Sequence, residues 1–258
     1  CNLQDEAVIE SIDADTIYDV PLLMKKERLD KVVLERLKLQ LRDEPGLERW
    51  QNFLTNYKNP KQTVNVALVG KYVELQDAYK SIQEALVHAG VPNLCSVNVI
   101  SVHSEELNSD NVAEELKGMH GIIVAPGFGQ RGLDGKIIAI KHARENRVPF
   151  FGICLGMQCC VIEFARNVLK LEDANSAEMN ANTPYPVIDI MEEQKAITNK
   201  GGTMRLGAYA CELKEGSLAK SIYGRTEISE RHRHRYEFNN KYLEQFEAAG
   251  MMATGKNL

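Results

Sequence analysis

Between residues 63 and 169, short apolar and often β-branched runs alternate with stretches of helical periodicity. The apolar runs predict strands at 64–69, 97–102, 121–125 and 148–153. The other stretches predict helices at 77–89, 111–116, 136–145 and 155–169. Strands this apolar are typical of a parallel sheet that is covered on both faces. The alternation therefore predicts an α/β fold with a doubly wound, mostly parallel sheet.

The segment before this alternation has a different character. Residues 1–57 are charged and helix-biased, with helices predicted at 29–41 and 47–54 and a proline-containing linker at 58–61. We therefore predict a boundary at residue 58, between a tail (1–57) and a larger domain (58–258). After residue 180 the alternation fades into a mixture of glycine, proline and charged residues, for which we predict no elements.

Charge and composition exclude several classes of protein. A net charge of −5 and a pI near 5.8 argue against a protein whose main task is to hold a nucleic-acid polymer. The sequence has no apolar run long enough for a membrane span and no charged-then-apolar segment, so we expect neither a membrane span nor a secretory leader. Six cysteines in such a chain, without a C-x-x-C pair, predict reduced thiols in the cytoplasm and no metal site. The ends, at Cys1 and Leu258, lead us to expect a segment of a longer protein.

The sequence Gly152-Ile153-Cys154-Leu155-Gly156 is the most informative motif. It has the spacing of a nucleophile placed at a sharp turn from strand to helix, with small residues on both sides. Such a cysteine projects from the carboxyl edge of the sheet and lies at a helix N-terminus, where partial positive charge favours the thiolate. The backbone amide of Leu155 would then face an oxyanion formed by attack of Cys154 on a carbonyl.

A buried structural thiol is the alternative for any cysteine, because free cysteine is among the most buried residue types. The spacing favours the nucleophile for Cys154, whereas we interpret Cys159 and Cys160 as structural. The loop Pro126-Gly127-Phe128-Gly129 follows the predicted strand 121–125. Gly127 would allow close approach of the backbone to a substrate and could supply a second oxyanion amide.

These two motifs together resemble the class I glutamine amidotransferases. Within that class the sequence resembles the CTP synthase family, in stretches at 129–132, 152–158, 173–178, 201–207 and 231–237. Residues 13–21 resemble the tail of that family's N-terminal synthetase domain. The resemblance covers nearly the whole chain and implies a flavodoxin-like sheet.

The resemblance implies that Cys154 attacks the side-chain amide of glutamine and forms a glutamyl thioester, with Gly127 and Leu155 as oxyanion donors. It implies no metal ligand in this chain. The residues that it implies for glutamine binding are Gly127, Leu155, Gly156, Met157, Gln158, Glu178 and Arg235.

For the full enzyme the resemblance implies amination of UTP with ammonia and ATP, with Mg²⁺ required and GTP as activator. Ala14 would lie near the ATP adenine. The resemblance also implies a cytoplasmic homotetramer that can form filaments, and a lid at 201–207. The basic run 231–235 then suits a nucleotide phosphate or an inter-domain contact better than a nucleic-acid polymer.

One motif of the family is missing. The family supplies the base for its cysteine from a His-Pro-Glu motif, and none of the six histidines is followed by Pro-Glu. We expect that motif beyond Leu258, which leaves the activity of this segment open. Two alternatives therefore stand: the glutaminase subunit of another class I amidotransferase or a γ-glutamyl hydrolase, and an inactive regulatory or assembly module.

Overall fold

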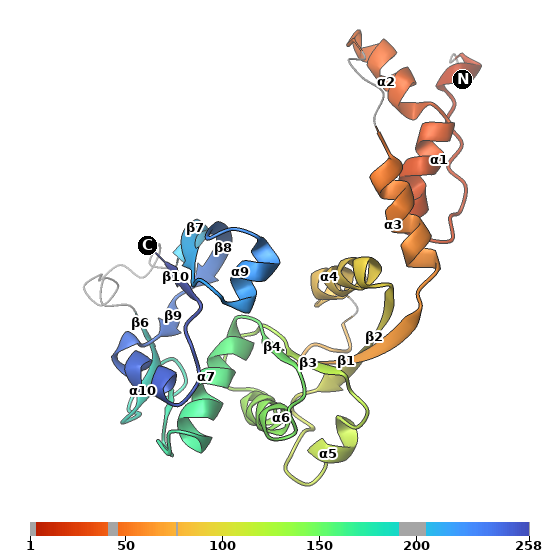
Figure 1. Ribbon diagram of the computed structural model, residues 1–258. Coiled ribbons are helices and arrows are strands. Elements are labelled where there is room, and N and C mark those ends of the chain that lie inside the picture. Colours follow the sequence, from red (N-terminus) through yellow and green to blue (C-terminus); the bar gives the residue numbers. More distant parts are fainter. Residues whose placement is uncertain (1–3, 41–45, 76, 191–204, 258) are drawn as a thin grey trace. The chain divides into compact units, whose positions relative to one another are not determined.

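The structure is a computed structural model that describes all residues except 1–3, 41–45, 76, 191–204 and 258 (Figure 1). Contacts within the chain divide it into two compact units. Unit 1 comprises residues 1–64 and 81–97, and unit 2 comprises residues 65–80 and 98–258. This division describes compactness, so the functional boundary at residue 58 stays a prediction.

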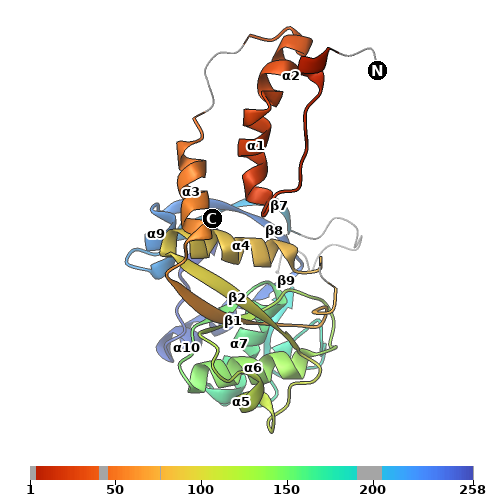
Figure 2. The same cartoon turned by 90° about the vertical axis from the view of Figure 1, so that its right-hand side faces the viewer.

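Unit 1 is mostly helical, and its helices α1 and α3 lie side by side (Figure 2). Its elements are η1 (Asp5–Ala7), η2 (Ile17–Asp19), α1 (Val20–Lys26), α2 (Leu29–Leu37), α3 (Glu48–Lys58), α4 (Lys80–Gly90) beyond its first residue, and η3 (Val91–Asn93). The prediction that one helix covers 29–41 was wrong at its end. Lys38 has a φ of 55°, and this left-handed conformation ends α2.

An aromatic cluster forms the interior of unit 1. The Tyr18 ring has ring neighbours at centroid distances of 5.2–5.9 Å, and these are Trp50, Phe53, Tyr57 and His88. The Tyr18 hydroxyl donates a hydrogen bond to Glu84 and lies 3.1 Å from Nε2 of His88. Burial, and then the bond to Glu84, raise the pKa of Tyr18 to about 12. The side chains of Tyr18, Glu84 and His88 therefore connect η2, which lies just before α1, with α4.

Unit 2 is built on a four-stranded sheet with the order β2-β1-β3-β4. The strands are β1 (Gln62–Gly70), β2 (Cys95–His103), β3 (Gly121–Val124) and β4 (Phe150–Gly152), of which β1 and β2 begin in unit 1. β3 pairs in parallel with both β1 and β4. The order is that of a doubly wound, flavodoxin-like sheet, which confirms the predicted α/β class.

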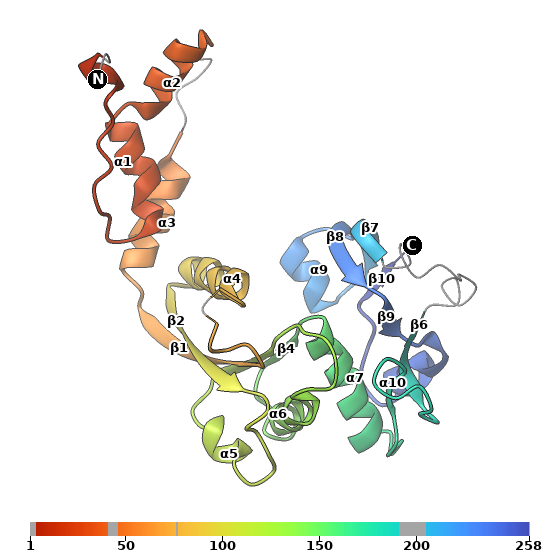
Figure 3. The same ribbon diagram turned by 180° about the vertical axis from the view of Figure 1, so that it is seen from behind.

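Three helices belong to this part of unit 2: α5 (Val112–Glu115), α6 (Leu133–Glu145) and α7 (Leu155–Asn167). α6 and α7 lie next to each other beside the sheet (Figure 3). Their apolar side chains, such as Ile140 and Ile162, pack with Val69 and Val124 of the strands to form the core. The predicted helix 77–89 begins only at Lys80, because the residues before it form hydrogen-bonded turns.

Two further sheets lie beyond α7, and all of their strands except β5 come after residue 180, where the sequence predicted no elements. One has the order β5-β6-β9 and the other the order β10-β7-β8. Their strands are β5 (Asn175–Ser176), β6 (Pro186–Ile190), β7 (Arg205–Leu213), β8 (Glu227–His234), β9 (Tyr236–Phe238) and β10 (Gly255–Asn257). The helices among them are α9 (Leu218–Tyr223), η4 (Asn240–Tyr242) and α10 (Leu243–Ala248). None of the helices that the structure describes is long and apolar enough to span a membrane.

Candidate active site

Cys154 lies at the turn between β4 and α7, as its motif predicts. Its backbone has a φ of 56° and a ψ of −111°, a conformation that residues with a side chain rarely adopt. The two glycines of the motif make this turn possible. A Cβ on Gly152 would lie 2.6 Å from the carbonyl carbon of Gly156, and a Cβ on Gly156 would lie 2.1 Å from the carbonyl oxygen of Val124. The backbone is therefore packed too closely here for any larger residue.

The thiols near this turn differ in their exposure to solvent. Cys154 is half-buried and lines a pocket, whereas Cys159 is fully buried on the next turn of α7. Burial raises the pKa of Cys159 and of Cys160 to about 12. Both thiols are thus protonated near neutral pH, which supports their interpretation as structural residues. The five cysteines that the structure describes are all free thiols.

The pocket beside Cys154 has a volume of about 220 Å³. Its walls come from the loop after β3, the start of α7, the segment after β5, and the β8–β9 connection. The lining residues are Gly127, Phe128, Cys154, Gln158, Glu178, Arg233, His234, Arg235 and Tyr236. The structure therefore brings Cys154 together with four other residues of the predicted site: Gly127, Gln158, Glu178 and Arg235.

Contacts within the site hold its walls in place. Nε2 of Gln158 donates a hydrogen bond of 3.0 Å to the carbonyl oxygen of Tyr236, which joins α7 to β9. A Cβ on Gly127 would lie 3.5 Å from Cδ2 of Leu155, so the two predicted oxyanion residues are neighbours. Glu178 is still exposed to solvent. Partial burial raises the pKa of its carboxyl group, while Arg235 and Lys71 act in the opposite direction.

Three other predicted residues lie elsewhere. Gly156 is buried against Val124, and Met157 is exposed. Neither residue is among the described residues that line the pocket. Ala14 is an exposed residue of unit 1. The predicted lid at 201–207 lies largely outside the described residues, which resume at Arg205, the first residue of β7.

Two buried lysines next to the pocket escaped the sequence analysis. Lys71 directly follows β1, and its Nζ donates a hydrogen bond to the carbonyl oxygen of Phe128. Lys136 belongs to α6, and its Nζ donates a bond of 2.8 Å to the carbonyl oxygen of Ala125. A lysine directly after a buried strand, and another immediately before the apolar run 137–140, were the available signals.

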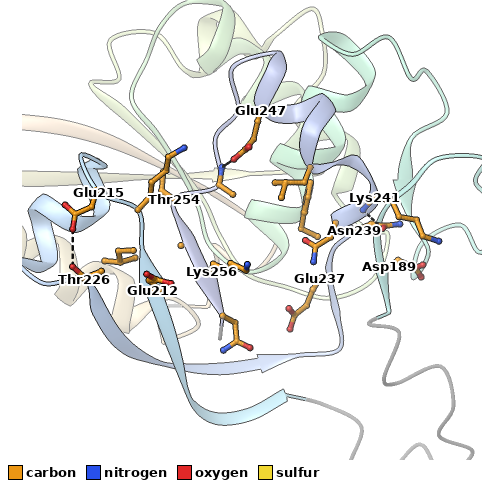
Figure 4. Close-up of a pocket in the computed structure, with 18 of the residues that line it drawn as sticks. Asp189, Glu212, Glu215, Thr226, Glu237, Asn239, Lys241, Glu247, Thr254 and Lys256 are labelled. Carbon is orange, nitrogen blue, oxygen red and sulfur yellow. Dashed lines mark hydrogen bonds between the residues drawn. The ribbon is translucent and has the colours of Figure 1, made fainter.

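A second, larger pocket of about 1050 Å³ also lies in unit 2 (Figure 4). Its wall is mixed in charge: Asp189 lies near Lys241, and Glu212, Glu237 and Lys256 also line it. Cys154 is not part of this wall. The described residues contain no group of three or more His, Cys, Asp or Glu side chains that could hold a metal ion.

Comparison with known proteins gives one consistent family. Residues 74–258 match the family described as glutamine amidotransferase class-I. The chain is 65% identical to a CTP synthase of Cytophaga hutchinsonii and 60% identical to one of Flavobacterium johnsoniae. Both matches extend over 257 residues, which are 100% of this chain and 48% of each relative. The chain thus spans about half the length of these curated relatives.

A solved structure shows the same relation. The glutaminase domain of Trypanosoma brucei CTPS, with bound acivicin, is 39% identical to this chain, with a TM-score of 0.69. The match covers 74% of this chain and 74% of that one. The chain therefore belongs to the class I glutamine amidotransferase family, and within it to the relatives of the CTP synthase glutaminase domain.

Proposed function

We propose that unit 2 holds a glutaminase site with Cys154 as its nucleophile. The Cys154 sulfur attacks the side-chain carbonyl carbon of glutamine, and the carbonyl oxygen becomes an oxyanion held by the amides of Gly127 and Leu155. The C–N bond then breaks, the nitrogen takes up a proton and leaves as ammonia, and a glutamyl thioester remains. Water hydrolyses the thioester to glutamate. The strained turn that presents Cys154 to a pocket with Gly127 and Glu178 carries this proposal.

Glutamine binding involves the polar side of the pocket. The Glu178 carboxylate suits the substrate ammonium group, and Gln158 with the backbone of Arg235 suits its amino-acid end. Gly156 and Met157 contribute through the backbone of the first turn of α7. For the base we retain the His-Pro-Glu motif that the family resemblance implies and that this sequence lacks. His234 lines the pocket, but we assign it no part in proton transfer.

For the whole protein we propose the activity of its relatives, amination of UTP to CTP with ammonia and ATP, activated by GTP. In this proposal residues 1–57 are the tail of the synthetase domain, with Ala14 near the ATP adenine, and residues 58–258 are the glutaminase domain. The assembly is a cytoplasmic homotetramer that can form filaments. Mg²⁺ belongs to this proposal as a requirement of the whole enzyme; the described residues offer no cluster of metal ligands, and no step of the glutaminase reaction depends on it.

Labelling with acivicin, an electrophilic amino acid, tests the glutaminase site. We expect one adduct, located on Cys154 by peptide mass mapping, and slower labelling when L-glutamine is present. Cys154→Ser should abolish the adduct, and D-glutamine should not protect. Adducts spread over several cysteines, or labelling indifferent to L-glutamine, would contradict the proposal.

The same labelling separates the alternatives. In an inactive assembly module, acivicin should not label one cysteine selectively, and L-glutamine should not slow the labelling. Another class I amidotransferase or a γ-glutamyl hydrolase would also be labelled, but identities of 60–65% to CTP synthases over the whole chain argue against both.

A further inference from the structure

Lys136 is a lysine without any solvent exposure in the middle of α6. Its ammonium group donates a hydrogen bond of 2.8 Å to the carbonyl oxygen of Ala125, at the start of the loop that contains Gly127. Burial of a charged ammonium group costs free energy unless polar or charged partners compensate it. Such a group in the core of an α/β domain therefore calls for an explanation.

Lys71 holds the other end of the same loop. Its side chain is 5% exposed, and its Nζ donates to the carbonyl oxygen of Phe128. A Cβ on Gly127 would lie 3.2 Å from Cε of Lys71 and 3.5 Å from Nζ of Lys136. Two cationic side chains thus flank the loop 125–128, and each holds one of its carbonyl groups.

The groups that face Lys136 leave one candidate for an opposite charge. Of the residues that the structure describes, none forms a carboxylate ion pair with Lys136; the charged or titratable groups that act on it are Lys71, Cys159 and Cys154. Lys71 has the same charge, and burial keeps the Cys159 thiol neutral by raising its pKa to about 12. The sulfur of Cys154 remains.

We propose that Lys136 is a positioning residue of the glutaminase site, whose buried ammonium group fixes the loop 125–128 and stabilises negative charge on the Cys154 sulfur. The inference rests on the proposed glutaminase function and adds an electrostatic role to it. Attack on glutamine moves negative charge from this sulfur to the oxyanion beside Gly127. The fixed ammonium group of Lys136 therefore stabilises the thiolate before the attack and the oxyanion after it. Burial lowers the pKa of Lys136, and Lys71 acts in the same direction, so the ammonium form depends on its bond to the Ala125 carbonyl and on the Cys154 sulfur.

Alkylation of Cys154 by iodoacetamide, measured against pH and without glutamine, tests this role. Iodoacetamide is uncharged and reacts with thiolate, so the rate follows the thiolate fraction. We expect Lys136→Met and Lys136→Gln to slow alkylation of Cys154 about tenfold at neutral pH and to move its midpoint to higher pH. Lys136→Arg should retain the wild-type profile. Lys141→Met is the matched control, because it removes an exposed lysine from the same helix.

The variants also separate charge from folding. Lys136→Gln keeps a hydrogen-bond donor and loses the charge, so it decides the matter if Lys136→Met fails to fold. An unchanged profile in a folded Lys136→Gln or Lys136→Met protein would overturn the proposal. If every Lys136 variant unfolds, the unmutated protein provides the test. Blocking Cys154 with a neutral methylthio group should lower the pKa of Lys136, which NMR of its Nζ can follow. An unchanged pKa of Lys136 would overturn the proposal. Acivicin labelling tests the glutaminase proposal independently, so the two failures are distinguishable.

Discussion

Cys154 has a backbone conformation that only close packing can maintain, and Gly156 is the residue on which that packing depends most. The glycine comes within contact of the Val124 carbonyl on β3, so α7 begins directly against the sheet. This contact fixes the first turn of α7, and with it the position of Cys154 at the pocket. The strain at Cys154 is thus supported by strand and helix together.

Gly156→Ala should therefore destabilise the protein strongly. The added Cβ would meet the carbonyl oxygen of Val124 at 2.1 Å, and a backbone atom cannot swing aside as a side chain would. We expect a loss of about 3 kcal/mol or more in the free energy of unfolding, measured with urea. Gly216→Ala is the control: Gly216 has a φ of 72° with open space around it, and should cost about 1 kcal/mol. Equal losses would show that the contact at Gly156 relaxes easily.

Glu178 provides a prediction of pH dependence. Partial burial raises the pKa of its carboxyl group, so this group takes up a proton at a higher pH than an ordinary glutamate. Because the charged carboxylate is the form that attracts the ammonium of glutamine, protection of Cys154 by glutamine should weaken as pH falls through that raised pKa. Glu178→Gln should weaken protection about tenfold and remove this part of the pH dependence. A wild-type profile in Glu178→Gln would exclude Glu178 from glutamine binding.

Sequence patterns could identify Cys154 and its glycines because the chemistry and the turn occupy five consecutive residues. They could not identify Lys71 and Lys136. The partners of these lysines are carbonyl groups of residues 125 and 128, brought to them by the pairing of β1 with β3 and by the packing of α6. The sequence alone does not distinguish a buried lysine from a solvated one, because the burial depends on the fold.

At the level of elements, burial explains which strands the sequence revealed. β1 and β3 contain continuous apolar runs, since the doubly wound sheet buries them. β8 reads Glu-Ile-Ser-Glu-Arg-His-Arg-His and has mostly exposed or half-buried residues, so no apolar pattern marked it. Its strand conformation comes from antiparallel pairing with β7, from Arg205 opposite His234 to Glu212 opposite Glu227. Such pairing between distant residues leaves no local signal.

The ion pair between α6 and α7 gives a prediction at this scale. Glu163 is 1% exposed and accepts hydrogen bonds from Arg144, which keeps 34% of its side chain exposed. Arg144→Met would leave a buried carboxylate without its cation, at a cost of about 3 kcal/mol in the free energy of unfolding. We expect the double variant Arg144→Met/Glu163→Met to be more stable than Arg144→Met alone.

A surface pair serves as the control for this measurement. Lys117 and Glu114 form an ion pair with both side chains more than 70% exposed. Lys117→Met should change the free energy of unfolding by less than about 0.5 kcal/mol. If the double variant is as unstable as Arg144→Met, the loss comes from packing of the arginine side chain and not from the stranded charge.

At the scale of the whole molecule, the two units differ in how much apolar surface they bury. Among the described residues, the buried hydrophobic side chains of unit 1 are Tyr18, Leu54 and Val91. The large core, from the strands through α6 and α7 to Phe246, consists entirely of residues of unit 2. Since burial of apolar surface is the main favourable term in folding, unit 1 has much less to hold it together.

Equilibrium unfolding in urea should therefore separate the units. Trp50, the single tryptophan of the chain, belongs to the aromatic cluster of unit 1, and Cys159 is fully buried in unit 2. We expect the fluorescence of Trp50 to change at a lower urea concentration than the one at which Cys159 reacts with a pulse of iodoacetamide, with far-UV ellipticity recording both steps. Coincident midpoints would mean that the chain unfolds as one cooperative unit, and that the Tyr18–Glu84–His88 contacts are no weaker than the core of unit 2.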